Sequence, residues 1–388
     1  MPAPTPDVVS LGCRLNIAES DAIRAMLGGC DAVVVNSCAV TGAAVKQTRV
    51  AIRRARRARP SAELIVTGCA ATIDPAGFTG MAEVDRVVPN AAKLLPASWG
   101  ARRAVVPVAR HARAFVPVQN GCDHACTFCI IPHGRGASVS IPVDAVVERV
   151  TALVAAGQCE VVLTGVDLTS YGPEPTLGHL CERLLTATKV ERLRLSSVDA
   201  HEIDPTLFEL LASEPRMMPH IHLSLQAGND LVLKRMKRRH SRADAIALVA
   251  RLKARRDVAI GADLIAGFPT ESEAMFADTL ALLDDCDIVH AHIFPYSARE
   301  GTPAARMPQV ALEVRRERAA RLRAAAADRK ARWLRTLIGT VQDVLVEKPG
   351  DRGHAGNFAE VRTTPASVGS VQRVAIAGVA GDQLIGMQ

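Results

Sequence analysis

Residues 115–136 read FVPVQNGCDHACTFCIIPHGRG and place three cysteines, Cys122, Cys126 and Cys129, in one short loop after a β-branched run. Thiolates spaced this closely can share one iron–sulfur cluster, and a cluster with three protein ligands keeps one iron open. An open iron is suited to chemistry, whereas a fourth local cysteine would indicate electron storage. A zinc site is the alternative, with its fourth ligand from His124, His133 or a distant residue.

The region around this loop, from residue 115 to about 308, alternates apolar strand-like runs with helical segments. Six such strands joined by right-handed crossovers predict an α/β fold with a partial (β/α)6 parallel barrel, whose functional groups gather at the carboxyl ends of the strands. The cluster loop follows the first strand and is expected at that rim. The predicted strands are 115–118, 160–164, 192–196, 220–225, 258–264 and 288–294, and the predicted helices are 143–156, 176–187, 205–212, 230–255 and 272–284.

The segment before the barrel, residues 1–105, has the pattern of a smaller α/β domain. Three apolar runs are each followed by a cysteine: VVSLG by Cys13, VVVNS by Cys38 and LIVTG by Cys69. Parallel strands present their carboxyl ends at one edge of a sheet, so these cysteines are expected to meet there. The spacing favours a second three-thiolate cluster, although each cysteine alone could equally be a buried structural residue. Residues 97–113 have no clear periodicity and are expected to be a linker.

The C-terminal residues 333–388 are rich in β-branched residues and glycine, which predicts a small five-stranded barrel of the OB-like kind that is common in RNA-binding modules. A purely structural role remains the alternative. Three basic segments, 49–59, 234–242 and 315–335, are interpreted as helical surfaces that suit phosphate contacts better than diffuse charge does. The structural alternative for the first is an ordinary solvated helix face.

The chain has 388 residues, a net charge of +7 and 3% aromatic residues, which weakly favours a polyanionic partner and disfavours broad base-stacking surfaces. No apolar run approaches the roughly 18 residues of a membrane span, and the start lacks the pattern of a signal peptide. A cytoplasmic protein without membrane association is therefore expected. In that reducing compartment, cysteines are first considered as metal ligands, reactive thiols or core residues.

Two histidine pairs, His220/His222 and His290/His292, have the i, i+2 spacing that places both side chains on one face of a strand. They could bind a metal, but hydrogen-bonded histidines inside a barrel are the favoured interpretation. Four other cysteines are interpreted as core residues or incidental thiols: Cys30, Cys159, Cys181 and Cys286.

Over nearly its whole length the sequence resembles the radical S-adenosylmethionine methylthiotransferases. The stretch CDHACTFCIIPHGRG is similar to their radical cluster loop, and GCRLNIAESD, NSCAVT and VTGCAA are similar to the three cysteine signatures of their N-terminal domain. HLSLQAGNDLVLKRMKRRH, DLIAGFPTES and HIFPYSAREGTPAA match their barrel, and the tail resembles a TRAM domain. The signatures around the first two cysteines most resemble the branch that acts on threonylcarbamoyladenosine at tRNA position 37. ASVSIP after Arg135-Gly136 and QAG at Gln226–Gly228 depart from the usual pattern.

The resemblance implies an enzyme that transfers a methylthio group to C2 of the adenine base by radical chemistry. It implies S-adenosylmethionine and two [4Fe-4S] clusters, one held by Cys122, Cys126 and Cys129 and the other by Cys13, Cys38 and Cys69. No general base among the carboxylates is expected to act. Thr164, Gly165, Gln226 and Phe128 are predicted to line the S-adenosylmethionine pocket, with a core position as the equal alternative for Phe128.

The implied domains are 1–105 for the auxiliary cluster, 114–330 for the radical core and 333–388 for a TRAM-like RNA-binding module. The implied partners are the anticodon loop of tRNA and an external one-electron donor such as flavodoxin or ferredoxin. Three alternatives stay open at this point: action on isopentenyladenosine-37 of tRNA, action on an aspartate of a ribosomal protein, and a non-enzymatic zinc-dependent RNA-binding protein.

Overall fold

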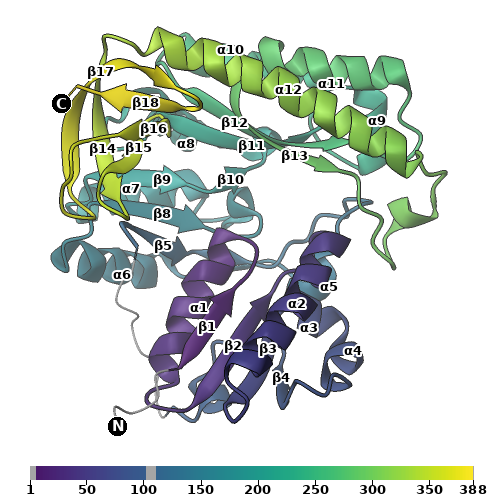
Figure 1. The fold of residues 1–388 in the computed structure, drawn as a ribbon. Coiled ribbons are helices and arrows are strands. Elements are labelled where there is room, and N and C mark those ends of the chain that lie inside the picture. Colours follow the sequence, from purple (N-terminus) through teal and green to yellow (C-terminus); the bar gives the residue numbers. More distant parts are fainter. Residues whose placement is uncertain (1–5, 102–110, 388) are drawn as a thin grey trace. The chain divides into compact units, whose positions relative to one another are not determined.

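The computed structural model describes residues 6–101 and 111–387, and the chain divides into two compact units (Figure 1). The first unit comprises Met1–Arg110 together with two later segments, Asn120–Val139 and Ser297–Thr302. The second comprises His111–Gln119, Ser140–Tyr296 and Pro303–Gln388. In the predicted linker, residues 96–99 form a short 3-10 helix with a buried Trp99, and residues 102–110 lie outside the described residues.

A four-stranded parallel sheet with the order β1-β2-β3-β4 forms the centre of the first unit. Its middle strands are continuous apolar runs because both faces are covered: Val35 and Val66 belong to one core, and Val34 and Ile65 belong to the other. The strands are β1 (Asp7–Ser10), β2 (Ala32–Ser37), β3 (Glu63–Gly68) and β4 (Arg86–Val88). The helices are α1 (Arg14–Met26), α2 (Gly42–Ala58), α3 (Cys69–Ile73), α4 (Pro75–Thr79) and η1 (Pro96–Trp99).

The two later segments of the first unit are attached to this sheet by packing and hydrogen bonding. Ile130 is buried in the same core as Val35, Val66 and Cys69, and α5 (Ile131–Arg135) contacts α3. The Ser297 hydroxyl accepts a hydrogen bond from the Gly42 amide at 3.1 Å. The short strands β6 (Gln119–Asn120) and β7 (Val139–Ser140) pair with each other on either side of the cluster loop.

Six parallel strand positions form the partial barrel of the second unit, as the alternation of strands and helices predicts. Three strands pair in the order β5-β8-β9 and four in the order β10-β11-β12-β13, and a parallel bridge between Leu193 and Met217 joins the two groups. The short β10 continues the line of β9 after Ser196. The strands are β5 (Arg113–Pro117), β8 (Glu160–Thr164), β9 (Arg192–Leu195), β10 (Ser197–Val198), β11 (His220–Gln226), β12 (Ala259–Ala266) and β13 (Ile288–Pro295).

The helices of the second unit follow the strands, with one difference from the prediction. The expected helix 230–255 is two helices, because Lys237 adopts a left-handed conformation (φ 58°) and Ser241 begins the second helix with a capping box to Asp244. The helices are α6 (Val143–Ala155), η2 (Leu168–Ser170), α7 (Leu177–Ala187), η3 (Ala200–Glu202), α8 (Pro205–Ser213), α9 (Asp230–Met236), α10 (Arg242–Lys253), α11 (Glu273–Asp285), η4 (Pro303–Arg306) and α12 (Leu312–Thr336).

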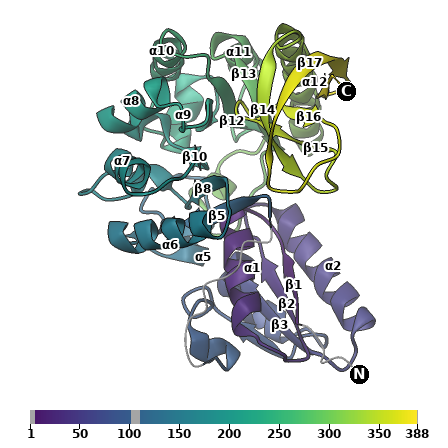
Figure 2. The same ribbon diagram turned by 90° about the vertical axis from the view of Figure 1, so that its left-hand side faces the viewer.

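The C-terminal strands close into a small barrel in the order β14-β15-β16-β18-β17, which confirms the prediction of a five-stranded β-barrel. The core of this barrel includes Ala259 of β12, Val289 of β13 and Trp333 of α12, so it packs directly on the partial barrel (Figure 2). The strands are β14 (Val341–Glu347), β15 (Arg352–Ala355), β16 (Glu360–Arg362), β17 (Val371–Ala380) and β18 (Gln383–Gly386).

A buried group of charges lies at the amino ends of the partial-barrel strands. Glu160, the first residue of β8, has a fully buried side chain that accepts hydrogen bonds from Arg113, Arg192 and Arg194. Burial alone would raise the pKa of Glu160, but the three guanidinium charges outweigh it and lower the pKa to about 2. The same arginines reach the C-terminal barrel, since Arg192 donates to the Asp343 carbonyl and Arg194 to the Ala355 carbonyl.

Among the described residues, no helix combines the length and the apolar character that crossing a membrane would require.

Candidate functional site

The three N-terminal cysteines follow the ends of three neighbouring strands, as predicted. Cys13 is the N-cap of α1, Cys38 follows the last residue of β2, and Cys69 is the first residue of α3 directly after β3. Cys38 and Cys69 are buried, whereas Cys13 is exposed. The sheet therefore delivers the three thiols to one edge with one side accessible to solvent.

Gly12 permits the close approach of the first and second cysteine loops. Its φ of +98° is a conformation that residues with a side chain rarely adopt. A Cβ at this position would lie 2.7 Å from the Cys38 Cβ and 2.9 Å from the Cys38 Sγ. The Gly-Cys pair at residues 12–13 therefore combines a thiol with the backbone turn that brings the next thiol beside it.

The electrostatics of Cys38 show that the three thiols are neighbours. Its pKa is raised mainly by burial, and the charges of Cys13 and Cys69 raise it further, while a hydrogen bond from the Val40 amide opposes the shift. Three thiolates in such a place repel one another unless a cationic centre lies among them. An iron–sulfur cluster is such a centre, and its usual ligands are cysteine thiolates, so the donor set fits the cluster that the sequence predicts.

Four polar side chains that were not predicted as site residues lie near these cysteines. Asn90 donates from its side-chain amide to Cys69 Sγ at 3.6 Å and to the Gly134 carbonyl at 2.5 Å. Arg135 donates to both carboxylate oxygens of Glu19, at 2.7 and 3.0 Å, and Lys93 donates to Glu19 Oε2 at 2.5 Å. Glu19 lies in the motif LNIAES and Arg135 in the motif PHGRG, so these motifs could have identified both residues. No sequence pattern points to Lys93 or Asn90.

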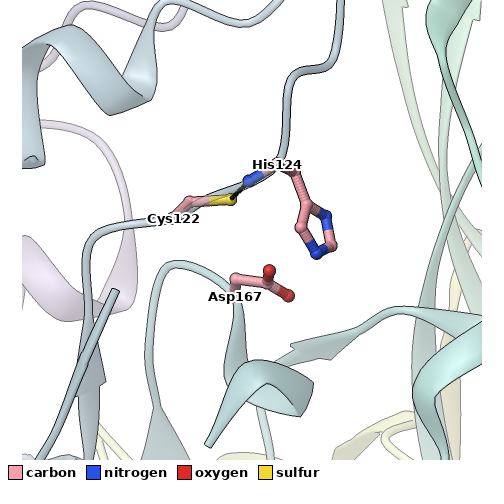
Figure 3. Close-up of side chains that lie close together, drawn as sticks. All are labelled: Cys122, His124 and Asp167. Atoms are coloured by element: carbon pink, nitrogen blue, oxygen red, sulfur yellow. Dashed lines mark hydrogen bonds between the residues drawn. The ribbon is translucent and has the colours of Figure 1, made fainter. Parts of the chain in front are cut away.

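The loop that carries Cys122, Cys126 and Cys129 is held by its own backbone. The Cys122 amide donates to the Gly136 carbonyl and the Cys129 amide to the Cys126 carbonyl, both at 3.1 Å. The His124 amide donates to Cys122 Sγ at 3.4 Å (Figure 3). All three thiols are partly exposed, so the loop offers a donor set that a cluster and a small ligand can reach.

Gly121, directly before this loop, is in contact with the chain where the loop returns. Its φ is +74°, and a Cβ there would lie 1.8 Å from the Ala137 carbonyl oxygen. Only glycine therefore allows the two ends of the loop to approach as they do.

The residues predicted for the S-adenosylmethionine pocket fall into different units. Thr164 ends β8 and is buried, and Gly165 directly after it lies against Gln119. The Gln119 side-chain oxygen accepts hydrogen bonds from the Val166 and Asp167 amides, both at 3.0 Å. Gln226 ends β11 with a φ of +70°, a strained conformation of the kind found at functional sites. Phe128 is half-buried in the cluster loop of the first unit. The assignment of these four residues stays a prediction.

The histidine pairs hydrogen bond with other groups of the second unit, and His222, Asp263 and His292 also lie close enough together to hold a metal ion. His222 Nε2 and His292 Nδ1 both hydrogen bond with Asp263 Oδ1, at 3.1 and 3.2 Å, so the partners lie on neighbouring strands and not within one pair. His290 Nε2 donates to the Asn357 carbonyl of the C-terminal barrel at 3.2 Å. Burial lowers the pKa of His290 to about 3, which keeps the ring neutral.

Many arginines of the three basic segments form ion pairs within their own unit. In 49–59, Arg54 and Arg57 are exposed, while the other four arginines form ion pairs within the first unit. The pairs are Arg49–Asp74, Arg53–Glu83, Arg56–Asp85 and Arg59–Asp31. In the other two segments several arginines are likewise paired: Arg238–Asp199, Arg239–Glu202, Arg242–Asp285, Arg318–Glu271 and Arg321–Glu273.

Two family models match the chain. Residues 116–283 match the radical SAM superfamily, and residues 6–89 match an uncharacterized protein family, UPF0004. A solved radical S-adenosylmethionine methyltransferase, TsrM from Kitasatospora setae with cobalamin and a [4Fe-4S] cluster bound, has the same fold with a TM-score of 0.52. At 16% identity over 71% of this chain and 66% of the other, that likeness concerns the fold alone.

Curated relatives cover almost the whole sequence. A threonylcarbamoyladenosine tRNA methylthiotransferase, MtaB, of Rickettsia prowazekii is 44% identical over 96% of this chain and 95% of its own length. A tRNA-2-methylthio-N(6)-dimethylallyladenosine synthase of Novosphingobium aromaticivorans is 34% identical over 90% of this chain and 88% of its own. With these matches over nearly its full length, the chain belongs to the radical S-adenosylmethionine methylthiotransferase family.

Proposed function

We propose that this enzyme transfers a methylthio group to C2 of N6-threonylcarbamoyladenosine at position 37 of tRNA. The relative that is 44% identical carries this substrate in its name, whereas the relative named for dimethylallyladenosine is 34% identical. The C2 position carries an unactivated C–H bond that an acid or base side chain does not break at neutral pH. Radical chemistry supplied by S-adenosylmethionine and an iron–sulfur cluster is suited to it.

Two cysteine sets would hold two [4Fe-4S] clusters. Cys122, Cys126 and Cys129 would bind the cluster at which S-adenosylmethionine is cleaved, with the electron coming from an external donor such as flavodoxin or ferredoxin. Cys13, Cys38 and Cys69 would bind the second. The observation that carries this proposal is the convergence of Cys13, Cys38 and Cys69 at the carboxyl ends of three neighbouring parallel strands.

The chain's own residues would prepare both sites before any chemistry. The Gly12 turn holds Cys13 beside Cys38, and the Asn90 side chain donates to Cys69 Sγ, a contact that orients this sulfur. The Cys122–Gly136 and Cys129–Cys126 backbone bonds fix the second loop. A fixed donor set reduces the ordering that cluster binding requires.

Iron and sulfide content after anaerobic reconstitution tests the two-cluster proposal, with about eight irons per chain expected. Cys38→Ala and Cys126→Ala should each lower the content to about four. Cys30→Ala, at an exposed cysteine of the first unit, is the matched control and should leave it unchanged. A native protein with four irons that Cys38→Ala does not reduce would exclude the second cluster.

The substrate is tested by mass spectrometry of tRNA nucleosides from a deletion strain. Loss of the methylthio form of threonylcarbamoyladenosine, restored by the native chain and not by Cys126→Ala, supports the proposal. Loss of the methylthio form of isopentenyladenosine instead would support the function named for the 34% identical relative. Unchanged tRNA would exclude both.

A further inference from the structure

Three ionisable side chains of the first unit form a buried cluster beside the N-terminal cysteines. The Glu19 and Arg135 side chains and the Lys93 ammonium are each only 1–2% exposed. Glu19 comes from α1 and Arg135 from the end of α5, and 116 residues separate them in sequence. Arg135 also donates to Asn16 Oδ1 at 2.5 Å and to Asn120 Oδ1 at 3.0 Å.

The cluster adjoins the cysteines in space. A Cβ on Gly134, the neighbour of Arg135, would lie 3.2 Å from the Cys69 Cβ. The charges of Cys69 and Cys13 act on Arg135, and the charge of Cys69 acts on Lys93. With Arg135 and Lys93 both protonated, these two side chains and the one carboxylate leave a net charge of +1 buried next to the three cysteines.

Burying an arginine and a lysine is costly unless anionic partners compensate them, and one carboxylate compensates only one of the two. The remaining positive charge therefore needs a further anionic neighbour. The thiolates of Cys13, Cys38 and Cys69, bound to a cluster, are the anionic group that this arrangement fits. Arginine suits such a place because its guanidinium stays protonated even when buried.

We propose that Arg135 is a positioning residue that sets the reduction potential of the centre held by Cys13, Cys38 and Cys69. Its buried positive charge favours the reduced state, which carries one more negative charge, and Glu19 limits the effect by partly neutralising that charge. Net charge and hydrogen bonds around a cluster are established determinants of its potential. The inference rests on the proposed second cluster.

The competing explanation is a purely structural role, in which the Glu19–Arg135 ion pair only stabilises the packing of α5 against α1. The two explanations differ in the sign of their effects. If the pair is only structural, removing either partner breaks the same contact and both variants should have the same effect. If charge sets the potential, removing Arg135 and removing the Glu19 charge shift it in opposite directions.

The test uses the full-length chain with Cys122, Cys126 and Cys129 changed to alanine, so that only the N-terminal centre remains. After anaerobic reconstitution, a dithionite titration followed by electron paramagnetic resonance measures the one-electron potential. Arg135→Gln should lower the ratio of reduced to oxidised centre at a fixed potential about tenfold, equivalent to about 59 mV. Glu19→Gln should raise it, and Arg135→Lys should stay near the parent. Arg318→Gln, which removes a buried arginine–glutamate pair of the second unit, is the control and should cause no shift.

Shifts of equal sign in Arg135→Gln and Glu19→Gln, or no shift in either, would overturn the proposal. Should Arg135→Gln hold no iron, Glu19→Gln decides alone, and an unchanged or lowered potential then overturns it. The second cluster itself is judged separately by the parent. A parent without about four irons refutes the two-cluster function, and with it this inference, before any variant is compared.

Discussion

Replacing Glu160 by glutamine should destabilise the second unit strongly, although glutamine has nearly the same shape. The glutamate side chain is fully buried and is the shared partner of Arg113, Arg192 and Arg194. Without its charge, three buried guanidinium groups would repel one another at the amino ends of β5, β8 and β9. The contacts of Arg192 and Arg194 with the C-terminal barrel would weaken as well.

The magnitude follows from the pKa of Glu160. Its shift from 4.5 to about 2 corresponds to roughly 3 kcal/mol of stability at neutral pH. Removal of one partner from a buried ion pair typically costs about 3–5 kcal/mol, which is consistent. Because the pKa is lowered on folding, this stability is present above pH 4.5 and is lost as the pH falls toward 2.

Scanning calorimetry of the reconstituted chain measures the effect, and a loss of this size should lower the transition of the second unit by roughly 6–10 °C. Glu209→Gln is the matched control, since Glu209 pairs with Arg255 and both side chains are half exposed. That variant should change stability by at most about 0.5 kcal/mol. If Glu160→Gln behaves like Glu209→Gln, the charge balance assigned to Glu160 is incorrect.

Three further predictions concern the cysteine loops and the barrel interior. Gly121→Ala should prevent the cluster proposed for Cys122, Cys126 and Cys129, because its Cβ would lie 1.8 Å from the Ala137 carbonyl oxygen, and the iron content should fall by about half. Gly157→Ala is the control, since Gly157 also has a positive φ (+89°) but a Cβ there meets no atom within 4 Å, and this variant should retain the iron. Gly12→Ala should also halve the iron content, because a Cβ there would lie 2.7 Å from the Cys38 Cβ and disturb the cluster proposed for Cys13, Cys38 and Cys69. An unchanged iron content would contradict the proposed site at these three cysteines. His290→Gln should flatten the pH dependence of stability between pH 6.5 and about 3, because the buried ring has its pKa lowered to about 3 and the native protein loses stability as the pH falls below 6.5. Urea unfolding midpoints across that range measure the last effect, and parallel curves for the variant and the native chain would count against it.

The strands and the placement of the N-terminal cysteines could be predicted because both depend on local patterns. Buried parallel strands are continuous apolar runs, as in β2 and β3, and a cysteine directly after such a run must lie at the carboxyl edge of the sheet. The closed C-terminal barrel followed from short β-branched runs between glycines. The break after α9 was missed because it depends on one residue, Lys237, in a left-handed conformation that no helix-forming pattern excludes.

The fate of the basic residues could not be predicted for a different reason. An arginine run has the same sequence whether its carboxylate partners are absent or lie on another element. Arg56, for example, pairs with Asp85, which is 29 residues away, and also donates to backbone carbonyls. Only the tertiary structure shows that such a guanidinium is engaged. The same applies to Lys93, which lies 74 residues from its partner Glu19.

The segment Asn120–Val139 brings the two sets of cysteines into the same unit. It carries Cys122, Cys126 and Cys129, and it belongs to the same unit as Cys13, Cys38 and Cys69. Ile130, directly after Cys129, is buried in the core that contains Cys69, and Gly134 lies against Cys69 itself. A substitution in that core therefore acts on both cysteine sets through packing, because close-packed interiors transmit displacements instead of absorbing them. The loop of Cys122, Cys126 and Cys129 is thus packed against the sheet that bears Cys13, Cys38 and Cys69, so the packing of this core bears on the geometry of both cysteine sets.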